Sequence, residues 1–148
     1  MKWWRQFAAL EADDRALLLR AAASLLVARA ALAMLGFGRV RRLLLRAPLR
    51  VRDAGQARER AHAIALALAR AARHLPLRTT CLDRAVALWR LLAAEGVDAE
   101  LRIGVRSGDA LAAHAWVEHR GEALAGADPH DGFVPFDVPL LAAADRGR

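Results

Sequence analysis

The sequence predicts an α+β domain, with N-terminal helices and a cysteine-bearing helix packed on one side of a small antiparallel sheet. Two observations support this fold class. Apolar residues recur with helical spacing through much of residues 14–94. The period then changes to two over 99–106, and a second strand is predicted over 111–119. A length of 148 residues is typical of one compact domain, in which we expect a basic helical region, 1–56, to pack on a core formed by 57–148.

The first predicted helix begins near Asp13 or Asp14, either of which can act as the N-cap of a helix over about 14–35. Its predicted inner stripe consists of leucines three or seven residues apart: Leu18, Leu25, Leu32 and Leu35. A short basic helix over 39–46 follows a pair of glycines, and a proline ends it. After a predicted linker, a further helix runs from about 57 to 74.

The next helix is the one on which the functional prediction depends. Thr80 is a suitable N-cap, and Asp83, three residues later, completes a variant of the capping box. The helix is predicted over 81–94, and Gly96 ends it in a left-handed conformation. Cys81, the only cysteine of the chain, is therefore expected at the first helical position.

The C-terminal part of the chain is predicted to form the sheet. Alternation predicts that the first strand faces the core through three residues: Leu101, Ile103 and Val105. The Arg120-Gly121 pair predicts a tight hairpin between the second strand and a short third strand at 122–124. An extended segment over 133–136 contains a proline, which restricts it to an edge of the sheet.

Charge is unevenly distributed along the chain. Residues 1–60 carry 13 Lys and Arg against 5 Asp and Glu, a balance of +8, whereas residues 61–148 carry 10 against 11, a balance of −1. A basic surface suits an acidic protein, nucleic acid or anionic lipid, and it also keeps a chain rich in Ala and Leu in solution. Beyond the first seven residues few aromatic side chains lie among these basic residues, so we expect no nucleic-acid partner.

The apolar run over 16–37 is predicted to be a packed helix and not a membrane span. Arg20 and Arg29 interrupt it, and each would cost about 2.5–3.5 kcal/mol at the centre of a bilayer. No short apolar core followed by a cleavage site is evident. A single cysteine fits a reducing, cytoplasmic compartment and excludes an internal disulfide. Contact with a membrane surface through Trp3, Trp4 and the basic residues is an alternative.

Cys81 and His114 are the candidate catalytic residues. The unpaired N–H groups and dipole of a helix N-terminus favour a thiolate and can stabilise the oxyanion that forms when a carbonyl is attacked. His114 on the second strand would be the general base, and flanking alanines leave room for the helix end. A third group should orient the imidazole; Asp128 is the first candidate, with Asp131 and Asp137 as alternatives. We expect no cofactor and no metal ion.

Each of these residues also has a purely structural explanation. A single cysteine among Ala and Leu is often a buried, inert thiol. Asp83 can serve only as a helix cap, and Asp128 before Pro129 suits an ordinary turn. Trp89 and Trp116 are expected in the core. An alternative function is therefore a non-catalytic module that binds a peptide or a partner protein.

Three stretches of the sequence resemble the leader peptidases of lasso-peptide biosynthesis, which belong to the transglutaminase-like cysteine protease superfamily. The stretches are, in order, Cys81-Leu82-Asp83-Arg84-Ala85-Val86-Ala87-Leu88, residues 91–105, and Ala112-Ala113-His114-Ala115-Trp116-Val117-Glu118. Together they span about residues 79–125. The basic helical N-terminal part is similar to the short, stand-alone form of this family.

The resemblance implies a papain-like site in a transglutaminase-like fold, with Cys81 as nucleophile and His114 as general base and acid. It implies that the chain removes the leader peptide from a ribosomally synthesised precursor, so that a partner lasso cyclase can join the freed amine to a carboxylate side chain. The family acts with a leader-recognition protein that is either fused at the N-terminus or separate. Residues 1–75 are predicted to be helical and to lack the strands of such a domain, so a separate recognition protein is expected.

The third catalytic position departs from the family pattern. The acidic residue of the family lies about a dozen residues after the histidine, where this sequence has Gly126. Asp128 lies two residues further along. A dyad of Cys81 and His114 would still be workable, because the aspartate mainly fixes the tautomer and orientation of the imidazole.

Overall fold

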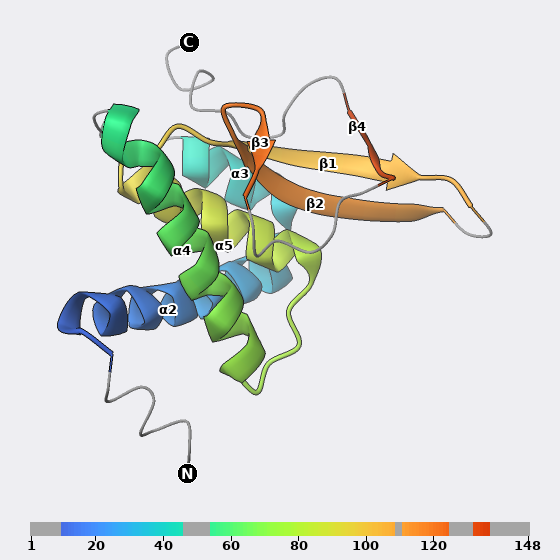
Figure 1. The fold of residues 1–148 in the computed structure, drawn as a ribbon. Helices are drawn as coiled ribbons and strands as arrows, with labels where there is room; N and C mark the ends of the chain where they lie inside the picture. The colour runs from blue at the N-terminus through green and yellow to red at the C-terminus, as the bar shows by residue number, and fades with distance from the viewer. Residues whose placement is uncertain (1–9, 46–53, 109–110, 125–131, 137–148) are drawn as a thin grey trace.

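The computed structural model of the chain describes residues 10–45, 54–108, 111–124 and 132–136. The helices of these residues are α2 (Ala12–Leu35), α3 (Phe37–Leu45), α4 (Ala54–His74) and α5 (Cys81–Ala94). The strands are β1 (Glu100–Arg106), β2 (Ala112–His119), β3 (Glu122–Ala123) and β4 (Val134–Pro135). They form a curled antiparallel sheet in the order β3-β2-β1-β4, and Figure 1 shows the helices gathered on one side of it. The predicted α+β fold class is confirmed.

The N-terminal helix α2 differs from the prediction in its start and in its buried stripe. It begins at Ala12, with Glu11 as an N-cap whose side chain makes no capping bond. Asp13 and Asp14 instead lie in the first turn, where the helix dipole still favours carboxylates. The predicted leucine stripe is partly correct: Leu25 is buried, Leu18 and Leu32 are partly buried against the core, and Leu35 is exposed. The fully buried residues are mostly small ones that let α4 and α5 approach closely: Leu17, Ala21, Ser24, Leu25 and Ala28.

The face of α2 that points away from α4 and α5 carries several large apolar side chains. By length and composition this helix could cross a membrane, a property that core helices of soluble proteins also have. Its inner stripe packs on α4 and α5. The exposed large apolar residues of its outer face are Leu19, Leu26, Val27, Met34 and Leu35.

Helices α3 and α4 both begin earlier than predicted. Gly36, with φ 72°, reverses the chain so that α3 starts at once at Phe37 and includes the second glycine of the pair. Helix α4 starts at Ala54, three residues before the predicted start at 57. Its inner face includes Ala61, Ile64 and Leu68, all of which are buried.

Both predicted ends of α5 are confirmed. Thr80 Oγ1 accepts a hydrogen bond from Asp83 N at 3.1 Å, and Thr80 N donates to Asp83 Oδ2 at 2.7 Å, which completes a reciprocal capping box. At the other end Gly96 has φ 75°, and Val97 N donates to Leu92 O at 2.9 Å. Helix α5 contacts α2, α4, β1 and β2, so it is the central helix.

The sheet follows the predicted alternation at Leu101 and Ile103, whereas Val105 is half-buried and lies outside the core cluster. In the β1–β2 register Leu101 pairs with Val117 and Ile103 with Ala115, and these side chains pack in the core with α5. Strand β4 pairs with β1 at the edge of the sheet, as expected for a strand that contains Pro135.

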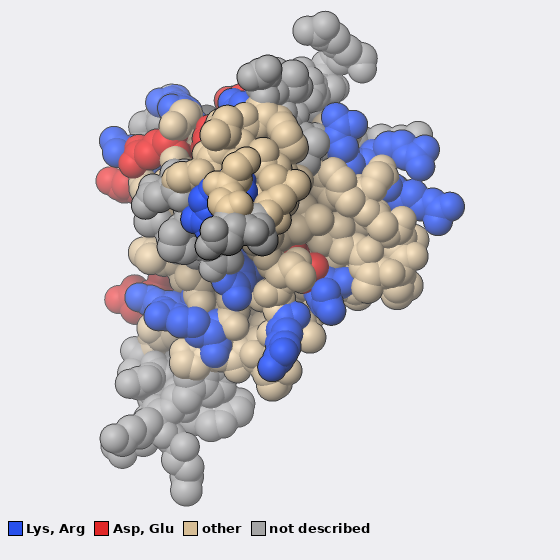
Figure 2. Space-filling view, turned by 90° about the vertical axis from the view of Figure 1, so that its right-hand side faces the viewer, with Lys and Arg blue, Asp and Glu red and all other residues tan. Residues whose placement is uncertain are grey.

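Arginines of the basic N-terminal half pair with acidic residues of the other half. Within the described ranges, α2 and α4 form these ion pairs with later parts of the chain: Arg20–Glu95, Arg29–Asp83, Arg58–Glu122 and Arg60–Glu95. Figure 2 shows further Lys and Arg side chains spread over one face, with Asp and Glu gathered mainly towards one edge of the view. Part of the charge asymmetry therefore holds the two halves of the chain together.

Candidate active site

Cys81 is the first residue of α5, as predicted, and its side chain is half-buried. The capping box occupies the N–H groups of Thr80 and Asp83. The N–H groups of Cys81 and Leu82 have no hydrogen-bond partner among the residues that the structure describes. The start of α5 therefore combines a thiol with two backbone donors, an arrangement that favours negative charge.

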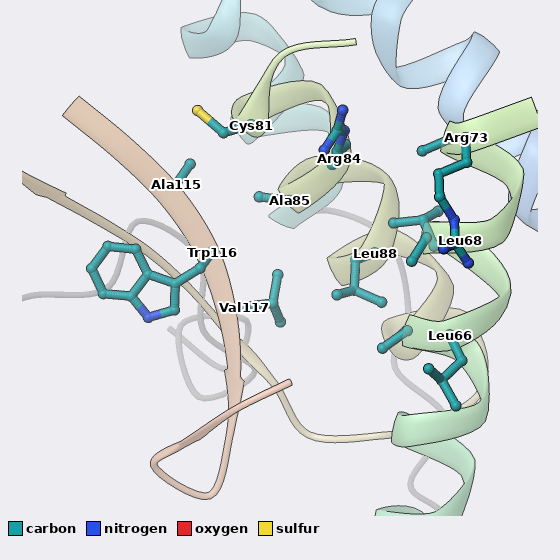
Figure 3. A pocket seen from close by; sticks show the side chains of 13 residues that line it. Leu66, Leu68, Arg73, Cys81, Arg84, Ala85, Leu88, Ala115, Trp116 and Val117 are labelled. Atoms are coloured by element: carbon teal, nitrogen blue, oxygen red, sulfur yellow. The ribbon is translucent and has the colours of Figure 1, made fainter. Parts of the chain in front are cut away.

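A cavity of about 410 Å³ opens beside Cys81, between α4, α5 and β2. Most of its walls are apolar, and they include the buried side chains of Leu68, Leu88 and Val117. Figure 3 shows Cys81 and Arg84 towards one end of the cavity and Leu88 towards the other. The thiol therefore lies at the margin of a space large enough for part of a peptide.

His114 lies in the middle of the sheet and is only 7% exposed. Its ring stacks on Trp116, with the ring centroids 6.0 Å apart and the planes 15° apart. Phe133, just before β4, contacts the same ring at a centroid distance of 5.1 Å. Two aromatic side chains therefore pack against the imidazole.

Strand β2 carries His114 and lines the cavity beside Cys81. Ala115 lines the cavity together with Cys81, and it is the residue directly after His114 on β2. Figure 3 shows Ala115 and Val117 directed towards α5, whereas Trp116 projects from the opposite side of the strand. His114 shares the Trp116 side by alternation. Within the described part of the chain, no hydrogen bond joins Cys81 Sγ to the His114 ring.

Glu118 connects the aromatic side of β2 to β1. It accepts a hydrogen bond from Trp116 Nε1 at 2.8 Å, and its other oxygen lies 3.4 Å from Arg102 Nε. Arg102 in turn donates to Glu100 Oε2 at 2.6 Å. This network fixes the indole on which His114 stacks, so Trp116 has a second role beyond the predicted one in the core.

Three aspartates are the candidates for the third catalytic position. Asp128, Asp131 and Asp137 all lie outside the residues that the structure describes. Over the described ranges, no group of three His, Cys, Asp or Glu side chains could hold a metal ion. Asp83, the acidic residue next to Cys81 in the motif, is buried in the capping box.

The sequence prediction missed three contributors to the site. Phe133 could not be recognised from the sequence, because it is far from β2 along the chain and only folding brings it to His114. Arg73 and Arg84 line the cavity, but on the sequence they look like ordinary surface residues of α4 and α5. The spacing of two between His114 and Trp116 was a usable signal, since it places both side chains on one face of a strand.

Comparison with protein families gives one match. A family model described as the transglutaminase-like superfamily matches residues 22–137, from within α2 to just beyond β4. Comparisons with curated proteins and with solved structures give no significant match. The matched range contains Cys81, His114 and the whole sheet.

Proposed function

Because the chain belongs to the transglutaminase-like superfamily, whose members are generally cysteine protease-like, we propose that it is a cysteine endopeptidase that removes the leader peptide from a lasso-peptide precursor. The observation that carries the proposal is the position of Cys81, at a capped helix start with two backbone donors and a cavity beside it. The resemblance of the motifs around Cys81 and His114 to the lasso leader peptidases supplies the substrate class.

The reaction proceeds through an acyl-enzyme. The thiolate of Cys81 attacks the carbonyl carbon of the scissile bond, and the N–H groups of Cys81 and Leu82 donate to the oxyanion. Collapse of this intermediate leaves a thioester on Cys81, and the departing amine takes a proton from His114. Water then attacks the thioester with His114 as general base, releasing the leader acid and the free thiol.

In this mechanism the His114 ring accepts the thiol proton once substrate is bound. Catalytic hydrogen bonds are often long or poorly aligned without substrate and tighten in the complex. The aromatic contacts with Trp116 and Phe133 limit the imidazole to a small set of orientations. The third residue that fixes the tautomer is Asp128, with Asp131 and Asp137 as alternatives.

The proposed partners are the precursor, a separate leader-recognition protein and the lasso cyclase that uses the freed amine. The compartment that fits these partners and a single cysteine is the cytoplasm. The described residues of α2, α3 and α4 supply helices and not the strands that a fused recognition domain needs.

Leader release is the direct test of this function. The purified chain is incubated with a precursor and its recognition protein, and the products are followed by mass spectrometry. We expect release of an intact leader by the native protein, none with Cys81→Ala, and a loss of at least about a hundredfold with His114→Ala. Undiminished release by Cys81→Ala would rule the proposal out.

One observation favours a second function, a non-catalytic module that binds a peptide. Cys81 Sγ and the His114 ring share no hydrogen bond in the described structure, although activated thiols usually have a paired base. The rate of alkylation by iodoacetamide at pH 6–7 separates the two functions. A fast reaction supports the peptidase, and the slow reaction of an ordinary thiol supports the binding module.

A further inference from the structure

We propose that the cavity beside Cys81 is a specificity pocket that binds an aliphatic side chain of the substrate peptide, while Arg73 and Arg84 attract an acidic group next to it. This inference rests on the proposed peptidase function, because it assigns the cavity to the peptide that Cys81 attacks. It goes further by naming the chemistry of the residues that the site selects.

The walls of the cavity suit an aliphatic occupant. The side chains that line it from three different elements include Leu68 of α4, Leu88 of α5 and Val117 of β2, all buried. Its volume of about 410 Å³ lies within the range of binding sites for small ligands. It therefore holds one apolar side chain together with a short stretch of the peptide backbone.

Leu66 extends the apolar wall to the surface. This leucine of α4 lines the cavity but is 49% exposed, although Leu68, the other leucine of the same helix, is buried. Figure 3 shows Leu66 near Leu88, at the end of the cavity away from Cys81. An aliphatic ligand that enters between these residues covers apolar surface that is otherwise in contact with water.

The charged side chains at the cavity determine which substrate group is favoured next to the bound aliphatic side chain. Besides Cys81, the ionisable residues that line it are Arg73 and Arg84, and no carboxylate of the described residues does so. Arg84 Nε donates to Thr79 Oγ1 at 2.9 Å, which holds this guanidinium beside the start of α5. Arg73 is exposed on α4, so a peptide can reach it. Two guanidinium groups favour a carboxylate and disfavour a lysine or arginine.

Peptide electrophiles that label Cys81 test this selectivity without a known precursor. The probes are three chloromethyl ketones: acetyl-Asp-Leu, acetyl-Asp-Gly and acetyl-Lys-Leu. The rate of covalent labelling of the native protein is read from intact mass, and each rate is divided by the rate with iodoacetamide. We expect acetyl-Asp-Leu to react about tenfold faster than acetyl-Asp-Gly, because the leucine side chain becomes buried. Acetyl-Lys-Leu should react several-fold more slowly than acetyl-Asp-Leu.

Two variants connect the selectivity to the cavity, each with a matched control on α4. Ala72→Phe fills the cavity and should abolish the preference for leucine, whereas Ala63→Phe, at another half-buried alanine outside it, should not. Arg73→Glu should reverse the preference between Asp and Lys. Arg70→Glu, at another exposed arginine of α4 that does not line the cavity, should leave it unchanged.

The possible results separate this inference from the proposed function. Fast iodoacetamide labelling with equal rates for all three probes would overturn the pocket and leave the peptidase standing. A preference that survives Ala72→Phe and Arg73→Glu would also overturn it, since the selectivity would then come from another part of the protein. If Cys81 reacts with iodoacetamide no faster than an ordinary thiol, both the function and this inference fail.

Discussion

Gly104 determines where the aromatic side of the sheet can pack. It pairs with His114 in the β1–β2 register. A Cβ atom at this position would lie 2.7 Å from Val134 O and 2.8 Å from Trp116 Cη2. The absence of a side chain therefore allows the indole to lie across β1 and allows β4 to pair at the edge. One glycine links the position of Trp116, and hence of His114, to the edge strand.

Gly104→Ala should lower the free energy of unfolding by about 1–3 kcal/mol, since both neighbours of the new methyl group must move. Urea denaturation measures the change. Gly108→Ala is the matched control, because a Cβ there meets nothing within 4 Å. Equal stabilities of the two variants would show that the Trp116 ring does not need this glycine.

The packing of the Trp116 ring can be tested separately from the hydrogen bond that its indole N–H donates to Glu118. Trp116→Phe keeps an aromatic ring beside His114 but removes the donor to Glu118, so we expect a loss of about 1–2 kcal/mol in unfolding free energy. Trp116→Ala also removes the ring and should cost about 3–5 kcal/mol. If the two substitutions lower the free energy of unfolding equally, packing of the indole does not stabilise this side of the sheet.

At the scale of helices, Glu95 is the point where three of them meet. It follows the last residue of α5 and binds Arg20 of α2 at 2.6 Å and Arg60 of α4 at 3.2 Å. Burial raises the pKa of this carboxyl, but the hydrogen bonds and charges of Arg60 and Arg20 outweigh burial and hold the pKa below its ordinary value. The cluster fixes the end of α5, whose start carries Cys81.

A depressed pKa in the folded state makes a prediction about pH. The stabilisation from Glu95 is fully present above the pKa of an unfolded glutamate and is lost as the pH falls through the lower folded pKa. Glu95→Gln should therefore be less stable than the native protein at pH 7, and the difference should shrink towards pH 3. Urea denaturation at both pH values measures it. A difference that is constant with pH would mean that the charge of Glu95 contributes nothing.

The local structure around Cys81 was predictable because it depends on neighbours in sequence. The capping box needs only Thr80 and Asp83, and the left-handed Gly96 follows from helix-end chemistry. The start of α2 was misplaced by two residues because the side chain of its N-cap, Glu11, makes no capping bond. The start of α4 was misplaced by three residues. The small residues in the buried stripe of α2 were missed because leucine spacing does not reveal that neighbouring helices need small residues.

At the scale of the whole molecule, the basic surface and the site lie on different elements. Arg39 and Arg42 of α3 are exposed and have no ion-pair partner among the described residues, whereas the cavity is lined by α4, α5 and β2. The fold class and the position of Cys81 at a helix start were predictable from the spacing of apolar residues and from the helix-capping residues. The cavity and the Phe133 contact were not, because residues far apart in sequence build them.

This separation predicts that partner binding and thiol chemistry can be changed independently. If α3 binds the recognition protein or an acidic leader, Arg39→Glu with Arg42→Glu should weaken binding at least tenfold at low salt. The iodoacetamide rate of Cys81 should stay the same. Binding is measured by calorimetry with the recognition protein, and unchanged affinity would remove α3 from the interface.

Trapping the acyl-enzyme tests the central claim, that Cys81 is the nucleophile of a peptidase. The native protein, a precursor and the recognition protein are mixed, quenched in acid during turnover and measured by intact mass, with peptide mapping of the adduct. We predict an adduct on Cys81 equal to the leader minus one water, since a thioester forms as the amine departs. Leader release without such an adduct, and at the same rate in Cys81→Ser, would contradict the account.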